Sequence, residues 1–177
     1  MKAMALVAHP DDCVIFAYSF MHHYNQLDWT VCYLTHTEQD PRGQEFAKFW
    51  HKRNIKTKFL GFIDSWNFVK NGELGFDSIL ATEAVKQVIA DQDLILTHDS
   101  RGDYGHLHHK FVHHVVCQNH TYVVCFAGIN KGNVKYTIDP SIYCLDEFPL
   151  HKDVVAGFHQ QHHTNEYTVS ERVRKIL

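Results

Sequence analysis

The stretch 8–12, Ala-His-Pro-Asp-Asp, constrains this chain most, because it places a metal-ligand histidine and two carboxylates between two apolar segments. The segment 3–7 before it is short, uncharged and typical of a buried strand. The segment 13–18 after it can supply the buried face of a helix. Pro10 favours an extended conformation at His9 and suits the first turn of a helix. The pattern therefore predicts a strand-to-helix turn that carries polar side chains.

Two interpretations fit the two aspartates of this turn. In an open α/β sheet, ligands bind at the carboxyl ends of the strands, and the dipole of the following helix keeps Asp11 and Asp12 ionised. Alternatively, one aspartate is a helix N-cap and the other is a spare acid, since Asp is common at helix starts. A second polar loop at the same edge of the sheet would favour the first interpretation.

Segments typical of strands and helices alternate along the chain, which predicts βαβ units and a mainly parallel sheet. Strands are predicted over 3–8, 29–35, 58–63, 93–97 and 122–127, and helices over 13–25, 43–54, 78–91 and 106–119. The segment 67–76, which contains Asn-Gly, predicts a loop or small hairpin, and the weaker pattern after residue 128 predicts a strand over 134–138 and a short helix over 151–159. We expect one α/β domain over 1–177, with a Rossmann-like, doubly wound, mostly parallel sheet.

Charge and composition exclude several classes of protein. The formal net charge of −3 and the lack of a Lys/Arg cluster argue against a nucleic-acid partner. No apolar run has the length of a membrane span, and the amino terminus does not resemble a signal peptide. Five cysteines without a CxxC pair fit free thiols in a reducing compartment, which predicts a cytoplasmic protein. No G-x-G-x-x-G follows the first strand, so dinucleotide binding is not expected.

The segment 97–109 repeats the design of the first turn: an apolar strand, a polar loop and histidines at a helix start. Since such loops emerge on one side of a parallel sheet, it can face the stretch 8–12 across one cleft. His106 and His109 are three residues apart and share a helix face. His9, one aspartate and one histidine of this pair would give three protein ligands and leave a position for water, as in a catalytic zinc site.

Spacing alone leaves further roles open for these histidines. His109 and His113 form an i, i+4 pair that suits zinc equally well. The chain holds 16 histidines, so the helix could simply expose a histidine-rich face to solvent, and a metal-buffering protein is a further alternative.

The combination of Ala-His-Pro-Asp-Asp after the first strand and Gly-His-x-x-His after a later strand resembles the zinc-dependent N-deacetylase family. That family includes the N-acetylglucosaminyl-phosphatidylinositol de-N-acetylase and the bacterial LmbE-like proteins. Three further segments, 42–47, 59–64 and 94–98, resemble the family's Arg-x-x-Glu helix, its third strand and its strand before the histidine loop. The matches span roughly residues 3 to 114.

The resemblance implies a role for each matching residue. His9, Asp12 and His109 fall on the zinc ligands of the family. Asp11 falls on its general base, and His106 falls on the histidine that stabilises the transition state.

Tyr104 falls on a tyrosine that approaches the oxyanion in some members of the family. Arg42 and Asp64 fall on positions that hold sugar hydroxyls or phosphate-like groups in some members. The sequence departs from the pattern at Cys13, where the family has Glu, and at His108, where it has Asp. Neither position is a ligand in the family, so we expect the zinc site to survive.

These residues together predict the zinc-assisted hydrolysis of an N-acyl group, most often acetyl, from an N-acetylglucosamine-type sugar in a larger conjugate. Trp66 and Phe68, which follow the third strand, are candidates for stacking on a sugar. An amidase acting on a non-sugar amide and a non-catalytic metal- or sugar-binding protein are the alternatives, and an intact Asp11 argues against the second. The oligomeric state is left open, and a homo-oligomer is compatible with the sequence.

Overall fold

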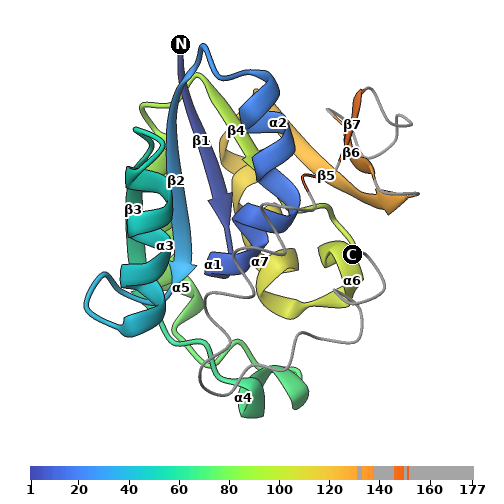
Figure 1. Ribbon diagram of the computed structural model, residues 1–177. Coiled ribbons are helices and arrows are strands. Elements are labelled where there is room, and N and C mark those ends of the chain that lie inside the picture. Colours follow the sequence, from blue (N-terminus) through green and yellow to red (C-terminus); the bar gives the residue numbers. More distant parts are fainter. Residues whose placement is uncertain (131–132, 138–145, 150, 152–177) are drawn as a thin grey trace.

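A computed structural model describes residues 1–130, 133–137, 146–149 and 151, and its core is a twisted sheet (Figure 1). Within these residues the strand order is β3-β2-β1-β4-β5-β6-β7. The strands are β1 (Lys2–Val7), β2 (Asp28–Thr35), β3 (Lys56–Phe62), β4 (Leu94–Thr97), β5 (Val123–Asn130), β6 (Asn133–Thr137) and β7 (Asp146–Pro149). Strands β1 to β5 pair in parallel, and β6 and β7 add an antiparallel edge. The predicted mostly parallel α/β sheet is confirmed.

Helices cover both faces of this sheet (Figure 1). They are α1 (Pro10–Asp12), the π-helical η1 (Cys13–Ala17), α2 (Tyr18–His23), α3 (Pro41–His51), α4 (Trp66–Lys70), α5 (Ser78–Ile89), α6 (Gly102–Gly105) and α7 (Leu107–Asn119). Helices α1, η1 and α2 follow one another without a break. The helical segment predicted over 13–25 therefore begins three residues earlier, at Pro10. Its π-helical turn is closed by the amide of Tyr18, which donates to the carbonyl of Cys13 five residues back.

The prediction of a loop or small hairpin over 67–76 is wrong in its first part, which lies in helix α4. The amides of Phe68 and Val69 donate to the carbonyl of Ser65, which starts the helix. The Asn-Gly dipeptide still forms a turn, and Gly72 has a φ of 80°. A turn dipeptide can end a helix as readily as it can join two strands. The helix predicted over 151–159 lies, apart from its first residue, outside the described residues.

The two faces of the sheet bury separate apolar cores, which follow from the two-residue period of the strands. Along β1, Ala3 and Val7 belong to the core under η1, α2 and α3, while Met4 and Leu6 belong to the core under α5 and α7. A strand buried on both faces needs an apolar residue at every position, as the segment 3–7 has. The continuous apolar run was therefore a correct sign of a central strand.

The strand order reverses direction between β1 and β4, which makes the carboxyl ends of these neighbouring strands the switch point of the sheet. The hydroxyl of Thr97 donates to the carbonyl of Leu6, and that of Thr35 donates to the carbonyl of Ala8, each over 2.8 Å. These bonds fix the ends of three strands relative to one another. Among the described helices, none has both the length and the apolar character needed to span a membrane.

Candidate metal centre

The first half of the centre is the turn after β1. His9 is the residue before helix α1 and has extended backbone angles, φ −124° and ψ 158°, as Pro10 predicts. The carboxylate oxygen Oδ2 of Asp12 accepts the backbone N–H of His9 at 2.8 Å, as in a capping box. Both side chains are buried, whereas Asp11 is more open to solvent. The turn therefore points one histidine and one carboxylate inward and leaves the second carboxylate at the rim.

The second half is the loop after β4, which is conformationally strained. Gly102 and Gly105 have positive φ, and so does Asp103, with φ 60° and ψ −61°. Such a conformation costs a non-glycine residue about 1–3 kcal/mol, so the surroundings must impose it. Asp99 does so in part, since its Oδ1 accepts the backbone N–H groups of Arg101 and Asp103, each at 2.9 Å. The result is a buried Asp103 carboxylate next to two histidines.

The hydrogen bonds of these two histidines fix which nitrogen carries the proton. His98 Nε2 accepts the backbone N–H of Ala8 at 2.9 Å, so His98 Nδ1 holds the proton and donates to Asp103 Oδ2 at 2.5 Å. The same oxygen accepts from His109 Nδ1 at 2.8 Å. His109 therefore turns Nε2 toward Asp12 and His9.

The outer nitrogen of His9 is fixed in the same way. His108 Nε2 donates to the carbonyl of Leu74 at 2.8 Å, which leaves His108 Nδ1 to accept from His9 Nε2 at 3.1 Å. Burial lowers the pKa of His108, which keeps its ring neutral. His9 Nε2 therefore carries a proton, and Nδ1 is the nitrogen of His9 that faces the centre.

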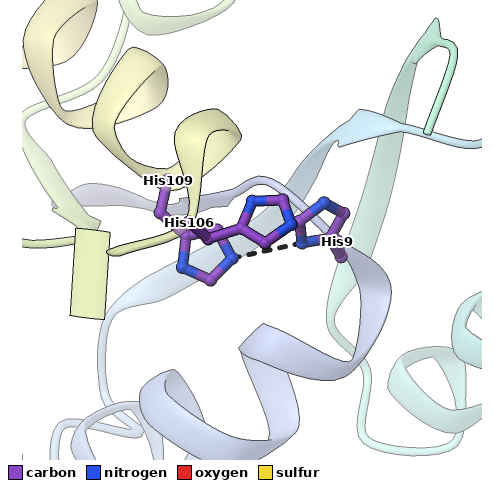
Figure 2. Close-up of side chains that lie close together, drawn as sticks. All are labelled: His9, His106 and His109. Carbon is purple, nitrogen blue, oxygen red and sulfur yellow. Dashed lines mark hydrogen bonds between the residues drawn. The ribbon is translucent and has the colours of Figure 1, made fainter. Parts of the chain in front are cut away.

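Three inward-facing atoms meet as a result. His9 Nδ1 lies 3.1 Å from both Asp12 Oδ2 and His109 Nε2, and the last two atoms are 3.2 Å apart (Figure 2 shows the two histidines). Tetrahedral zinc, with bonds of about 2.0–2.2 Å, needs nitrogen and oxygen ligands roughly 3.3 Å apart. The side chains therefore fit a metal cation in both donor type and spacing.

The charges in the centre also suit a cation. Burial alone would lower the pKa of His109, but the carboxylates of Asp12 and Asp103 outweigh it and raise the pKa to about 10. Burial would raise the pKa of Asp12, yet His109 and His9 hold it well below its ordinary value. The site thus stabilises one positive charge between two carboxylates, and a metal cation would displace the proton on His109.

His106 and Tyr104 lie beside these ligands. The ring of His106 is centred 4.6 Å from that of His9 and 4.8 Å from that of His109 (Figure 2). Its Nδ1 accepts the backbone N–H of His108 at 3.3 Å, and burial, aided by the neighbouring histidines, lowers its pKa to about 3. His106 is therefore neutral, with its proton on Nε2. Tyr104 is 45% exposed, with its ring 5.1 Å from that of His109.

A charged group forms the rim of the centre on the side of α3. Arg42 Nη2 donates to Asp11 Oδ1 at 2.6 Å, and Arg42 Nη1 lies 3.9 Å from Asp64 Oδ2. The other oxygen of Asp64 is 3.6 Å from His9 Nε2. Burial alone would raise the pKa of Asp64, but His36, His9 and His108 outweigh burial and lower the pKa below its ordinary value. Arg42 and Asp64, predicted to bind substrate, thus lie together beside the predicted base.

Several features of the centre escaped the sequence reasoning. His98 and Asp103 orient His109, and neither was singled out, although the two glycines that flank the Asp-Tyr pair at 103–104 indicate an unusual backbone there. The alternative pair of His109 and His113 is not supported, because none of the convergent groups of metal-ligand side chains among the described residues contains both histidines. His113 Nδ1 instead donates to the carbonyl of His98 at 2.9 Å.

Fold and site together define an α/β protein with a candidate two-histidine, one-carboxylate metal centre at the switch point of its sheet. The sequence matches the model of the PIG-L family, described as GlcNAc-PI de-N-acetylase, over residues 4–120. The chain therefore belongs to the PIG-L family. A comparison with curated protein sequences finds no match.

Solved structures share the fold at low sequence identity. A deacetylase of teicoplanin biosynthesis is 12% identical, with a TM-score of 0.56 over 71% of this chain and 66% of that one. A triple mutant of a teicoplanin-pathway deacetylase is 11% identical, with a TM-score of 0.57 over 91% and 81%. GalB, the 4-carboxy-2-hydroxymuconate hydratase of Pseudomonas putida KT2440, is 15% identical, with a TM-score of 0.53 over 71% and 65%. The chain thus spans about two thirds of the hydratase and of the first deacetylase.

Proposed function

We propose that this protein is a zinc-dependent hydrolase that removes an N-acyl group, usually acetyl, from an N-acetylglucosamine-type sugar or glycoconjugate. The observation that carries the proposal is the convergence of His9 Nδ1, Asp12 Oδ2 and His109 Nε2 within 3.2 Å of one another, beside a further carboxylate. The PIG-L family supports an enzyme of the deacetylase type.

The three convergent atoms would hold the zinc ion. When bound, zinc would supply Lewis-acid polarisation of an acyl oxygen and a water whose pKa is lowered to about 7. Asp103 and His108 hold the outer nitrogens of the two histidine ligands, as carboxylates and other acceptors do in zinc enzymes. This chain thus uses a neutral His108 at the position where the family resemblance predicts an aspartate.

Asp11 is the proposed general base. Arg42 occupies its Oδ1, so we assign proton acceptance from the attacking water to Oδ2. The Arg42 guanidinium also fixes the orientation of the carboxylate. Once protonated, Asp11 can deliver that proton to the nitrogen of the leaving amine, which completes the hydrolysis without a second acid.

His106 and Tyr104 are the proposed donors to the developing oxyanion. A neutral His106 can donate a hydrogen bond from Nε2 to the oxyanion. Its low pKa keeps the ring neutral across the physiological range. The phenol of Tyr104 can add a second donor. Loss of one such donor typically lowers the rate about 10²–10³-fold.

Sugar recognition is assigned to the rim. Arg42 and Asp64 offer a charged donor and a charged acceptor for hydroxyl groups. Trp66, in α4, is 69% exposed, and Phe68 is 42% exposed. Exposed aromatic rings next to polar groups at strand ends are suited to stacking on a pyranose face.

The test is mass-spectrometric detection of deacetylation across a panel of N-acetylated sugars, glycoconjugates and non-sugar amides. We expect activity on the sugars that is lost with a chelator and regained with Zn²⁺, and no activity in the Asp11→Asn variant. Activity on the non-sugar amides alone would replace the sugar substrate by another amide. The fold alone does not imply amide hydrolysis, because GalB shares it and is a hydratase. The absence of any chelator-sensitive amide hydrolysis would therefore refute the proposal.

We also propose a cytoplasmic protein without a nucleic-acid partner. The free cysteines among the described residues, Cys13, Cys32, Cys117 and Cys125, and the formal charge of −3 support this assignment.

A further inference from the structure

A second cluster of metal-ligand side chains lies between α7 and β5. It consists of His113 and Cys117 on α7 and Cys125 on β5, and their ligand atoms all lie within 4.8 Å of one another. His113 and Cys117 are four residues apart on one helix face, and Cys125 pairs with Thr97 in the neighbouring strand. None of the three belongs to the set formed by His9, Asp12 and His109.

The geometry of the cluster fits a thiolate site. His113 Nδ1 lies 3.6 Å from Cys117 Sγ and 3.6 Å from Cys125 Sγ. Zinc with bonds of about 2.3 Å to sulfur and 2.0–2.1 Å to nitrogen requires tetrahedral nitrogen and sulfur ligands roughly 3.6 Å apart. The two observed distances match this value. A disulfide between the two cysteines would not require an imidazole nitrogen close to both sulfur atoms.

The thiols are also chemically suited to a cation. The hydrogen bond from Cys125 outweighs partial burial and, with His113, lowers the pKa of Cys117. The same interaction and burial raise the pKa of Cys125, so its proton must leave when a cation binds. The buried Cys13 and Cys32 have no such partner, and burial raises their pKa values.

We propose that His113, Cys117 and Cys125 form a second cation site, separate from the catalytic centre, for a thiophilic cation of the Zn²⁺ class. Soft thiolates with one imidazole select such cations over Mg²⁺ or Ca²⁺. Binding displaces the Cys125 proton and the His113 Nδ1 proton that is now donated to the carbonyl of His98, and both go to solvent. The cation would link α7, which begins next to His106 and carries His109, to β5.

The probe is Co²⁺, because thiolate ligands give an intense charge-transfer absorption that histidine and carboxylate ligands do not. The titration uses reduced, metal-free full-length protein under anaerobic conditions, in a Cys144→Ser, His9→Ala background. The first substitution removes the fifth cysteine, which lies outside the described residues, and the second removes a ligand of the first centre. We expect the charge-transfer band to saturate at one equivalent of Co²⁺.

Variants assign the band to the three residues. Cys117→Ser, at an exposed position that leaves the core unchanged, and Cys125→Ser should each abolish it. His113→Ala should weaken binding and shift the visible bands, because a nitrogen ligand is lost. His51→Ala, an exposed histidine at the end of α3, is the matched control and should keep the band. Absence of the band in folded, reduced protein, or its survival in both cysteine variants, would overturn the proposal.

Discussion

The two strand ends that build the candidate metal centre differ in how they position its proposed ligands. After β1, a regular turn places His9 and Asp12 three residues apart, with Pro10 fixing the backbone and a capping hydrogen bond holding the carboxylate. After β4, His109 lies twelve positions beyond Thr97, and the loop passes through positive φ at Asp103. One half is local and relaxed, while the other is strained and held by distant contacts.

This difference predicts different effects for substitutions in the two halves. Changes at the β1 turn should remove a proposed ligand or the proposed base directly, because the side chains there face the centre. Changes in the β4 loop should act through His109, because His98 and Asp103 are buried side chains that hold that ring. Substitutions in both halves test this division, from the largest expected effect to the smallest.

The largest effect is expected for Asp12→Ala at the β1 turn. This substitution removes one of three protein ligands, so both bound zinc and turnover should fall to background. Elemental analysis of protein purified without added metal should give about one equivalent for the wild type and almost none for the variant. A zinc-loaded, active Asp12→Ala protein would show that the ligand set is wrong.

Asp11→Asn, one position earlier, should retain zinc but lose rate. An amide cannot accept the proton, and loss of a general base lowers the rate about 10²–10⁴-fold. Zinc content and turnover measured beside those of Asp12→Ala provide the comparison. If Asp11→Asn is metal-free while Asp12→Ala keeps its metal, the roles of the two aspartates are reversed.

Asp103→Asn tests the β4 loop. Asparagine keeps the shape and tolerates positive φ, but it removes the negative charge that holds His109 Nδ1. Loss of such a partner typically weakens metal binding about 10–100-fold, a smaller effect than loss of a ligand. Competition with a chromophoric chelator measures the affinity, with Asp91→Asn, at an exposed acid two residues after α5, as the control. Equal affinities for Asp103→Asn and the wild type would contradict the positioning role.

The smallest effect is a pH dependence at His106. Its pKa is about 3 in the folded protein, below the ordinary value of about 6.5, so the unfolded chain binds more protons between these two values. The free energy of unfolding of the metal-free protein should therefore fall as pH decreases from 6.5 toward 3, by at most about 1.4 kcal/mol per pH unit from this residue.

His106→Asn should flatten that slope, since it removes the titrating ring. Urea denaturation between pH 6.5 and 5 measures it, in a range where the carboxylates contribute little because they stay ionised in both states. Parallel slopes for the variant and the wild type would show that His106 is not a buried, neutral histidine.

Much of the fold could be predicted because its signals are local. The apolar run 3–7 predicts a strand buried on both faces, and the amphipathic segment 78–91 corresponds to α5 (Ser78–Ile89). The prediction of a loop or hairpin over 67–76 was wrong in its first part, since an Asn-Gly pair indicates a turn but not which element precedes it. That the domain extends through residue 177 stays a prediction.

The sequence by itself determined which residues could supply the chemistry. A histidine and two aspartates lie at one turn, and two histidines lie three residues apart at another. These motifs indicated the candidate donors, because they depend on neighbours along the chain. The family resemblance narrowed the set to His9, Asp12 and His109.

Only the tertiary structure decided how those donors are presented. The ring orientations of His9 and His109 depend on Leu74, Ala8 and Asp103, which lie far away in sequence or in a strained loop. Likewise, Cys125 joins His113 and Cys117 only because β5 lies beside α7. Proton positions and convergent lone pairs arise from contacts between distant segments, which no local pattern encodes.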